Sequence, residues 1–329
     1  MTESRASVTD LSENPFFIVG SPRSGTTLLR FILSSHPQLF VPAETGFIPH
    51  LGYKADADMS LGEVERLLGR IGQLNREWSQ MVKDERAFYY GLPEPRLTYV
   101  LDDLYRARMD GSGARRWGDK TPSYVLHMPM LSCLFPSAQF IHVIRDGRDA
   151  TLSADRKWGA QRWYMDQYYL LRNWVSHVEA GRSASRKLGG DRYIEIHYET
   201  LVEETAPLLE RICSFLGEEL HPAMLDHTAL ARRRIGPRGH LEVRQPISTE
   251  SVGRWRNEMS EFYCKVADRV AGPTLSSLGY ECSGLPGLTG SERLKLRALA
   301  AKYAITHMSR QTLTRMGLLT LNRGKRPRK

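Results

Sequence analysis

The sequence predicts an α/β domain with a central parallel sheet of about four or five strands, flanked by helices in three layers. Short apolar segments that suit buried strands alternate along the chain with longer segments whose apolar residues recur every three or four positions. This alternation is typical of β–α units, which set parallel strands side by side and pack helices on the sheet. Polar clusters directly follow two predicted strands, at the edge where such sheets bind ligands.

The first predicted unit is FFIVGSPRSGTTLLR, from Phe16 to Arg30, which has the pattern of a strand, a turn and a helix. Four apolar residues suit a buried strand, and apolar residues recur at helical spacing downstream (Leu28, Leu29, Ile32 and Leu33). Gly20 and Gly25 allow a tight turn and a close ligand, and the helix start near Thr26 offers unpaired N–H groups. The loop GSPRSGTT therefore predicts a phosphate-binding site.

The remaining elements follow in chain order. Strands are predicted at Leu39–Val41, in the segment that starts at Arg115, at Ala138–Ile144 and at Arg192–His197. Helices are predicted at Ser60–Ile71, at Arg96–Met109, after Arg145-Asp146-Gly147-Arg148-Asp149, within Gln161–Leu188, at Pro207–Leu216 and at Glu261–Leu278. Arg232–Gly253 has little periodicity, so we expect a structureless loop that acts as a lid over the ligand.

The two ends of the chain differ from its middle. Residues 1–14 predict a disordered leader, 15–290 the main domain, and 291–329 a basic helical extension with a tail. Eleven of the 46 Lys and Arg lie from Arg293 to Lys329, which contains no Asp or Glu, so the rest of the chain is slightly acidic and nucleic-acid binding is not predicted. The basic segment fits a solvated tail, a contact with an anionic membrane surface, or part of a homodimer or acceptor surface.

Composition places the chain among ordinary globular proteins. No apolar run reaches 18 residues and the N-terminus lacks the apolar centre of a signal peptide, which predicts a cytoplasmic location. Four cysteines without CxxC spacing favour neither a disulfide framework nor a zinc site, and we expect them to be small buried hydrophobic residues.

The loop GSPRSGTT matches the glycines of the P-loop pattern GxxxxGKS/T but lacks its lysine. Thr26 stands where nucleoside-triphosphate enzymes place the lysine, and Arg23 supplies a cation three residues earlier. A P-loop-like fold without a metal is therefore predicted. A kinase or a nucleotide-binding protein without group transfer remains an alternative.

PRSGTT after a buried strand, together with RDGRD and Ser153 after a second strand, resembles the two signatures of sulfotransferases that use 3′-phosphoadenosine 5′-phosphosulfate. The resemblance implies that the 5′-phosphosulfate is held by Arg23, Ser24, Gly25, Thr26 and Thr27. It assigns Arg145 and Ser153 to the 3′-phosphate, where a guanidinium offers a forked set of donors to a dianion.

The chain is more similar to tyrosylprotein sulfotransferases and their bacterial relatives than to the cytosolic small-phenol enzymes. PAETGFIP resembles the family segment that carries a catalytic glutamate, which gives that role to Glu44, and GDKTP gives the lysine role to Lys120. Tyr198 matches a tyrosine near the adenine, and the segment Val243–Trp255 matches a late loop. The acceptor would carry a hydroxyl or amine on a small molecule, a glycan or a peptide.

The implied chemistry is in-line sulfuryl transfer. We expect Glu44 to act as general base, and Lys120, Arg23 and Arg254 to stabilise the departing phosphate. Other interpretations stay open from the residues alone: Glu44 as a helix cap or solvated loop acid, Lys120 as a surface ion pair with Asp119, Ser153 as a helix surface serine, Tyr198 as a core aromatic, and Arg254 as ordinary packing. We further expect His142 to pack in the core, and Arg148 and Asp149 to form an orienting ion pair.

Overall fold

The computed structural model describes residues 14–52, 57–234 and 241–315. Its centre is one sheet in the order β2-β3-β1-β4-β5, and every neighbouring pair is parallel. The strands are β1 (Phe16–Gly20), β2 (Leu39–Phe40), β3 (Arg116–Lys120), β4 (Gln139–Ile144) and β5 (Tyr193–His197). The predicted parallel α/β sheet is confirmed.

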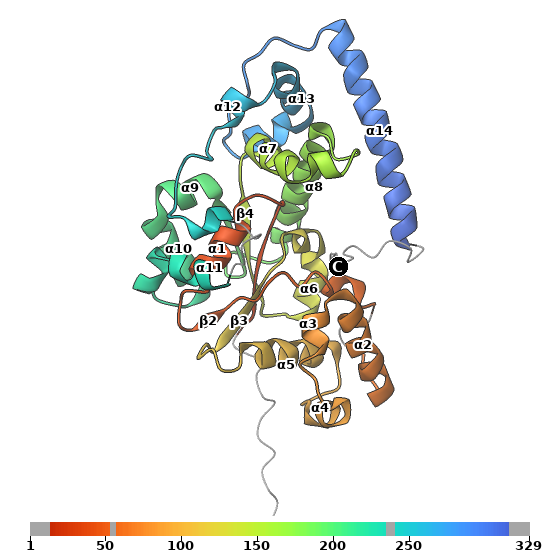
Figure 1. Ribbon diagram of the computed structural model, residues 1–329, viewed down its shortest axis with the longest axis vertical. Helices are drawn as coiled ribbons and strands as arrows, with labels where there is room; N and C mark the ends of the chain where they lie inside the picture. Colours follow the sequence, from red (N-terminus) through yellow and green to blue (C-terminus); the bar gives the residue numbers. More distant parts are fainter. Residues whose placement is uncertain (1–13, 53–56, 235–240, 316–329) are drawn as a thin grey trace, which may run out of the picture.

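Helices and short 3₁₀ turns connect the strands (Figure 1). The helices are α1 (Thr26–Leu33), α2 (Leu61–Leu74), α3 (Arg76–Ser79), α4 (Glu85–Gly91), α5 (Leu97–Met109), α6 (Met128–Leu134), α7 (Gly147–Trp158), α8 (Gln167–Ser185), α9 (Tyr198–Glu203), α10 (Thr205–Leu216), α11 (Thr228–Arg234), α12 (Trp255–Glu258), α13 (Glu261–Ser277) and α14 (Gly290–Arg315). The 3₁₀ turns are Ile48–His50, Pro122–His127, Gly159–Gln161, Pro222–Leu225 and Leu241–Arg244. The predicted leader up to residue 13 and the tail beyond Arg315 lie outside the described residues.

Side chains of β1 point alternately to the two faces of the sheet, so they belong to two apolar layers of the interior. Phe16 and Ile18 pack with apolar residues of α1, α9 and α10, whereas Phe17 and Val19 pack with α5, α6 and the turn Pro122–His127. Figure 1 shows α9 and α10 on one side of the sheet and α6 and α8 on the other. All four β1 side chains are fully buried, so both faces of the sheet are covered, as the three-layer prediction requires.

Local sequence sets where individual helices begin. Ser60 and Glu63 form a capping box that starts α2, and the Ser60 N–H donates to Glu63 at 2.8 Å. Asp166 starts α8 by accepting a hydrogen bond from the Tyr169 N–H at 2.9 Å. The helix predicted within Gln161–Leu188 therefore begins only after this cap.

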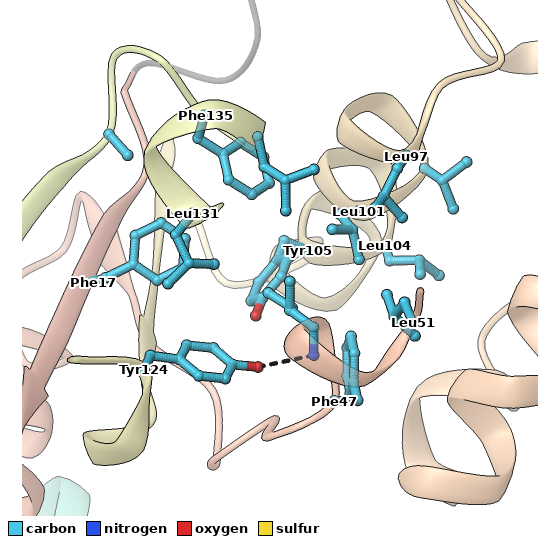
Figure 2. Packing of buried hydrophobic residues seen from close by; sticks show 14 of the residues in the cluster. Phe17, Phe47, Leu51, Leu97, Leu101, Leu104, Tyr105, Tyr124, Leu131 and Phe135 are labelled. Atoms are coloured by element: carbon cyan, nitrogen blue, oxygen red, sulfur yellow. Dashed lines mark hydrogen bonds between the residues drawn. The ribbon is translucent and has the colours of Figure 1, made fainter. Parts of the chain in front are cut away.

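A buried polar network joins the core to the carboxyl end of β3. The Tyr105 hydroxyl donates to Asp119 at 2.6 Å, and the Thr45 hydroxyl donates to the same carboxylate oxygen at 2.7 Å. Figure 2 shows Tyr105 and Tyr124 inside the apolar cluster, with the Tyr124 hydroxyl accepting from the Ile48 N–H at 3.2 Å. Burial raises the pKa of Asp119, and the donated hydrogen bonds oppose this effect. The network fixes Thr45 and Asp119, the chain neighbours of Glu44 and Lys120.

Replacing Tyr105 by phenylalanine is expected to lower the free energy of unfolding by about 1–3 kcal/mol, because Asp119 loses a buried donor. Urea denaturation followed by circular dichroism measures this. Tyr90→Phe is the control, since Tyr90 is 72% exposed and should change stability little. Equal stability of the two variants would show that the Tyr105 hydroxyl is not needed to hold the network.

Two predictions about single residues have opposite outcomes. His142 is fully buried and its Nδ1 lies 2.7 Å from the Tyr193 hydroxyl, so the core assignment is confirmed. Burial of all four cysteines is wrong, because Cys213 and Cys264 are buried but Cys133 and Cys282 are exposed. None of the described helices has the length and apolar character needed to span a membrane.

Candidate active site

The loop between β1 and α1 has the backbone shape of an anion cradle. Gly25 has φ 90°, and a Cβ there would lie 2.3 Å from the Tyr198 ring, so only glycine fits between the loop and that ring. Arg23 has φ 70°, in the left-handed region that costs a residue with a side chain about 1–2 kcal/mol. Strain of this kind gathers at ligand sites, where the surrounding structure holds it in place.

The polar groups of this loop fit an anionic ligand. The N–H groups in the first turn of α1 lack helical partners and carry the positive end of the helix dipole. Ser24 is fully buried, and its Oγ has no hydrogen-bond partner within the described residues. A buried hydroxyl without a partner is costly, so a bound oxyanion at this position would satisfy it.

The end of β4 and the following helix α7 bring a second cationic group to the loop. Arg145 is 6% exposed; it donates to the Arg23 carbonyl at 3.2 Å and to the Ser251 carbonyl at 2.5 Å, and its Nε has no partner within the described residues. Arg145 also stacks over the Tyr198 ring at 4.5 Å. Ser153 accepts a hydrogen bond from Arg23 Nε at 3.0 Å. Tertiary structure thus joins the two polar segments that the sequence singled out.

Glu44 and Lys120 face each other at the mouth of the loop. Lys120 Nζ lies 2.5 Å from Glu44 Oε1 and 3.2 Å from Thr27 Oγ1. The lysine side chain is 3% exposed and the glutamate side chain 50% exposed. Burial lowers the pKa of Lys120, and the Glu44 carboxylate opposes that shift. The alternative of a surface pair between Lys120 and Asp119 is wrong, because both side chains are buried and Asp119 is held by hydroxyls.

A cleft of about 610 Å³ collects these groups, and we call it the phosphate cleft. The sequence-predicted residues that line it are Arg23, Gly25, Thr26, Thr27, Glu44, Arg145, Ser153, Tyr198 and Arg254. Ser24, within the loop, is fully buried, and Lys120 reaches the cleft through Thr27 and Glu44. Arg254 lies at the rim, where it pairs with Glu258 at 3.0 Å. A volume of this size suits a nucleotide-sized ligand.

The segment 241–254 forms one wall of the phosphate cleft. Asp149 accepts hydrogen bonds from the Gly253 N–H at 2.7 Å and the Trp255 N–H at 2.8 Å, which ties this wall to α7. The prediction of a structureless Arg232–Gly253 loop is wrong in part, because α11 and the turn Leu241–Arg244 pack on α1 through Ala231, Phe31 and Val243. Its central residues 235–240 lie outside the described part, and the lid role stays a prediction.

The predicted ion pair between Arg148 and Asp149 is also wrong. Arg148 pairs with Asp146 at 2.7 Å, and its guanidinium stacks over the Trp255 ring at 3.5 Å. Asp149 is left for the backbone N–H groups described above. Asp146 and Asp149, at the start of α7, therefore have different partners: Asp146 pairs with Arg148, and Asp149 accepts from backbone N–H groups. Residue spacing alone does not decide which acid pairs with Arg148.

The phosphate cleft also contains charged residues that were not predicted, among them Lys157 and Glu242. Lys157 lines it one turn after Ser153, on the same face of α7, and burial followed by the nearby Arg23 lowers the lysine pKa. Glu242 lies 3.8 Å from Arg23. The four-residue spacing from Ser153 could have indicated Lys157, whereas nothing in the sequence around Glu242 separates it from other surface acids.

The fold and site together define a phosphate-binding α/β protein with a buried lysine and a carboxylate beside the loop, an arrangement that suits transfer of an activated anionic group. A profile described as the sulfotransferase family matches residues 15–222. The chain belongs to this family, and the predicted P-loop-like sulfotransferase fold is confirmed.

Curated relatives agree with this assignment. The chain is 27% identical over 282 residues to Protein-tyrosine sulfotransferase of Drosophila melanogaster. This match covers 80% of this chain and 51% of that protein. It is 27% identical over 280 residues to Protein-tyrosine sulfotransferase 2 of Gallus gallus, and this match covers 80% of this chain and 69% of that protein. It is also 27% identical over 305 residues to Nodulation protein NoeE of Sinorhizobium fredii, and this match covers 83% of this chain and 68% of that protein. The chain thus spans about half the length of the Drosophila relative.

Solved structures share the fold. The sulfotransferase domain from the Synechococcus PCC 7002 olefin synthase has a TM-score of 0.56 at 24% identity, covering 83% of this chain and 97% of that one. The sulfotransferase domain from the curacin biosynthetic pathway has a TM-score of 0.54 at 22% identity, covering 83% and 99%.

The cytoplasmic location expected from the sequence is contradicted by these relatives. That prediction used the lack of an apolar run and of a signal-peptide centre, whereas the matching curated relatives from animals are protein-tyrosine sulfotransferases and not cytosolic enzymes of the family. The lack of an apolar run in this sequence is therefore no guide to where the chain works.

Proposed function

We propose that this sulfotransferase takes its sulfuryl group from 3′-phosphoadenosine 5′-phosphosulfate and passes it to an acceptor hydroxyl, with Glu44 as general base. The observation that carries the proposal is the hydrogen bond between Arg23 and Ser153, which joins the β1–α1 loop to the β4–α7 segment 130 positions later. A ligand with phosphate groups on both the 3′ and the 5′ side of an adenosine needs two anion-binding sites in one cleft. The contact between Arg23 and Ser153 supports the placement of these two sites next to each other.

The residues present fit such a donor. The loop, the first turn of α1 and the partnerless Ser24 hydroxyl suit the 5′ end, and the partnerless Arg145 Nε suits the 3′-phosphate. Tyr198 lines the cleft beside Arg145 and would contact the base there. When bound, the donor supplies an activated sulfuryl group and leaves a phosphate whose negative charge grows during transfer.

The remaining groups divide the work of the reaction. Lys120 presents a buried cation, and Arg23 a partly buried one, to the charge that develops on the phosphate. Glu44 is half exposed and reaches into the phosphate cleft, so it accepts the proton of the acceptor hydroxyl. The pair with Lys120 orients the carboxylate, and the Thr45–Asp119 contact fixes the backbone behind it.

Isothermal titration tests the donor. We expect 3′,5′-bisphosphoadenosine to bind at least about 30-fold more tightly than 5′-AMP, because only the bisphosphate reaches Arg145 and Ser153. Equal affinity for the two nucleotides would contradict the 3′-phosphate site. Magnesium-dependent release of γ-phosphate from ATP, measured in parallel, would instead support the kinase or hydrolase alternative.

A further inference from the structure

Helix α14 (Gly290–Arg315) lies along the outside of the molecule and has two apolar faces (Figure 1). Its inner face packs on α8 and α13, where Leu296, Leu299 and Tyr303 contact the cluster that contains Leu171 and Val266. Its outer face carries a second row of apolar side chains, which we call the apolar stripe: Leu294, Ala298, Ala301, Ile305 and Met308.

The apolar stripe is exposed along its whole length. Its members are separated alternately by four and three residues, a spacing that places side chains on one face of a helix. Leu294 is 69% exposed, Ile305 68% and Met308 67%, and both alanines are exposed as well. The helix therefore does not use this face to pack on the described part of the chain.

An exposed tryptophan adjoins α14. Trp163 is 77% exposed, and Lys302 of α14 donates to the Trp163 carbonyl at 2.8 Å and lies 5.5 Å from the centre of its ring. Half of the eight strongly exposed large apolar side chains in the described residues thus belong to α14 or contact it. Exposed apolar side chains that gather in one place mark interaction sites, and tryptophan in particular is enriched where proteins meet the headgroup region of a membrane.

Positive charge accompanies the apolar stripe. Arg293 and Arg297 are exposed, one turn apart, and lie along one side of it. The one acid between residues 290 and 309 is Glu292, which is turned toward α13, where it pairs with Lys265 at 3.4 Å. From Arg293 to the last residue the sequence contains eleven Lys or Arg and no Asp or Glu. The outer face of α14 is therefore both apolar and cationic.

We propose that the outer face of α14 docks on an anionic lipid bilayer, with the apolar stripe and Trp163 among the headgroups and Arg293 and Arg297 on their negative charges. A helix with an exposed apolar row beside basic residues binds in the plane of such a surface. A second copy of α14 would set arginines against arginines, and a nucleic acid would leave the apolar stripe in water. This inference is independent of the proposed sulfotransferase function.

Co-sedimentation of the full chain with vesicles tests this surface. The vesicles contain phosphatidylcholine alone, or phosphatidylcholine with about 30% phosphatidylserine, whose negative surface potential attracts basic segments. We expect binding to the anionic vesicles to be at least about 10-fold tighter, and most of this difference to vanish in about 1 M salt, where charges are screened beyond about 3 Å. Equal binding to both vesicles, or binding to neither, would overturn the proposal.

A substitution within the apolar stripe separates its contribution from net charge. Ile305→Glu puts a carboxylate in the middle of the stripe and should weaken binding to the anionic vesicles at least about 10-fold. The matched control is Leu225→Glu, which makes the same change of charge at a 50% exposed position in the turn Pro222–Leu225. Equal weakening by the two variants would contradict a role for the stripe.

The basic residues are tested in the same way. Arg293→Ala combined with Arg297→Ala should weaken binding to the anionic vesicles at least about 10-fold, because each basic residue near such a surface contributes about fivefold. Arg66→Ala combined with Arg86→Ala, two exposed arginines on α2 and α4, is the control. If both pairs weaken binding equally, the arginines of α14 are not special and the proposed orientation is wrong.

Tryptophan emission reports the contact directly. The emission of the full chain should shift to shorter wavelength on the anionic vesicles, and Trp163→Ala should remove most of this shift. An undiminished shift in this variant would contradict the placement of Trp163 at the lipid surface.

Sedimentation equilibrium without lipid tests the other occupants. A dimer that Ile305→Glu dissociates, together with a lack of vesicle binding, would assign the outer face of α14 to a second copy of the chain. Binding of a soluble acidic amphipathic peptide without vesicle binding would assign it to a protein partner. Either result would overturn the lipid proposal, and thermal unfolding of each variant checks that it is folded.

Discussion

Replacing Glu44 by glutamine is expected to lower kcat by about 10²- to 10⁴-fold, the range that removal of a general base produces. Glutamine keeps the size and a carbonyl oxygen near Lys120, whose Nζ lies 2.5 Å from Glu44 Oε1, but it cannot take the acceptor proton. The affinity for 3′,5′-bisphosphoadenosine should stay within a few-fold of wild type, because the role proposed for Glu44 is toward the acceptor hydroxyl and not toward the donor phosphates. Steady-state rates with labelled donor and titration of the bisphosphate measure the two effects.

The control is Glu65→Gln, which removes a carboxylate from the exposed face of α2 and should leave kcat unchanged. The principal competing explanation is that Glu44 serves only to hold the buried Lys120. In that case the glutamine variant would lose bisphosphate affinity and thermal stability while keeping kcat. Such a result would show that a residue other than Glu44 is the general base.

Replacing Arg145 by alanine should weaken 3′,5′-bisphosphoadenosine binding by about 2–5 kcal/mol, because the 3′-phosphate would lose a buried cationic partner. This corresponds to about a 30- to 5,000-fold higher Kd. The guanidinium is 6% exposed and its Nε lacks a partner within the described residues, so a bound phosphate completes its hydrogen bonds. Binding of 5′-AMP should change much less, which isothermal titration can measure side by side.

Arg145 also supports the cleft wall through its hydrogen bonds to Arg23 and Ser251, so a purely structural loss has to be separated from a lost phosphate contact. Equal weakening of both nucleotides would indicate a structural role and contradict the phosphate assignment. Arg145→Lys should recover part of the bisphosphate affinity, because it keeps the charge but not the forked donors. Arg66→Ala, on the exposed face of α2, is the control for loss of a surface arginine.

The strongest sequence predictions were those with local physical causes. β1 and α1 follow from a buried apolar run, two glycines and helical periodicity, and the structure gives Phe16–Gly20 and Thr26–Leu33. The short helices α3, α4, α11 and α12 were missed because elements of four to seven residues carry too few positions to show a period.

The sequence by itself determined the parallel α/β class and the anion-binding loop, since these depend on residue type and on position after a strand, and the family resemblance supplied the candidate roles of Glu44, Lys120 and Arg145. Only the tertiary structure decided which partners these side chains meet. Lys120 faces Glu44 and not Asp119 because alternate residues of β3 point to opposite faces, and Arg148 pairs with Asp146 because of the turn that opens α7. The second cavity, of about 780 Å³, likewise joins residues from distant segments, so its lining could be known only once the chain was folded.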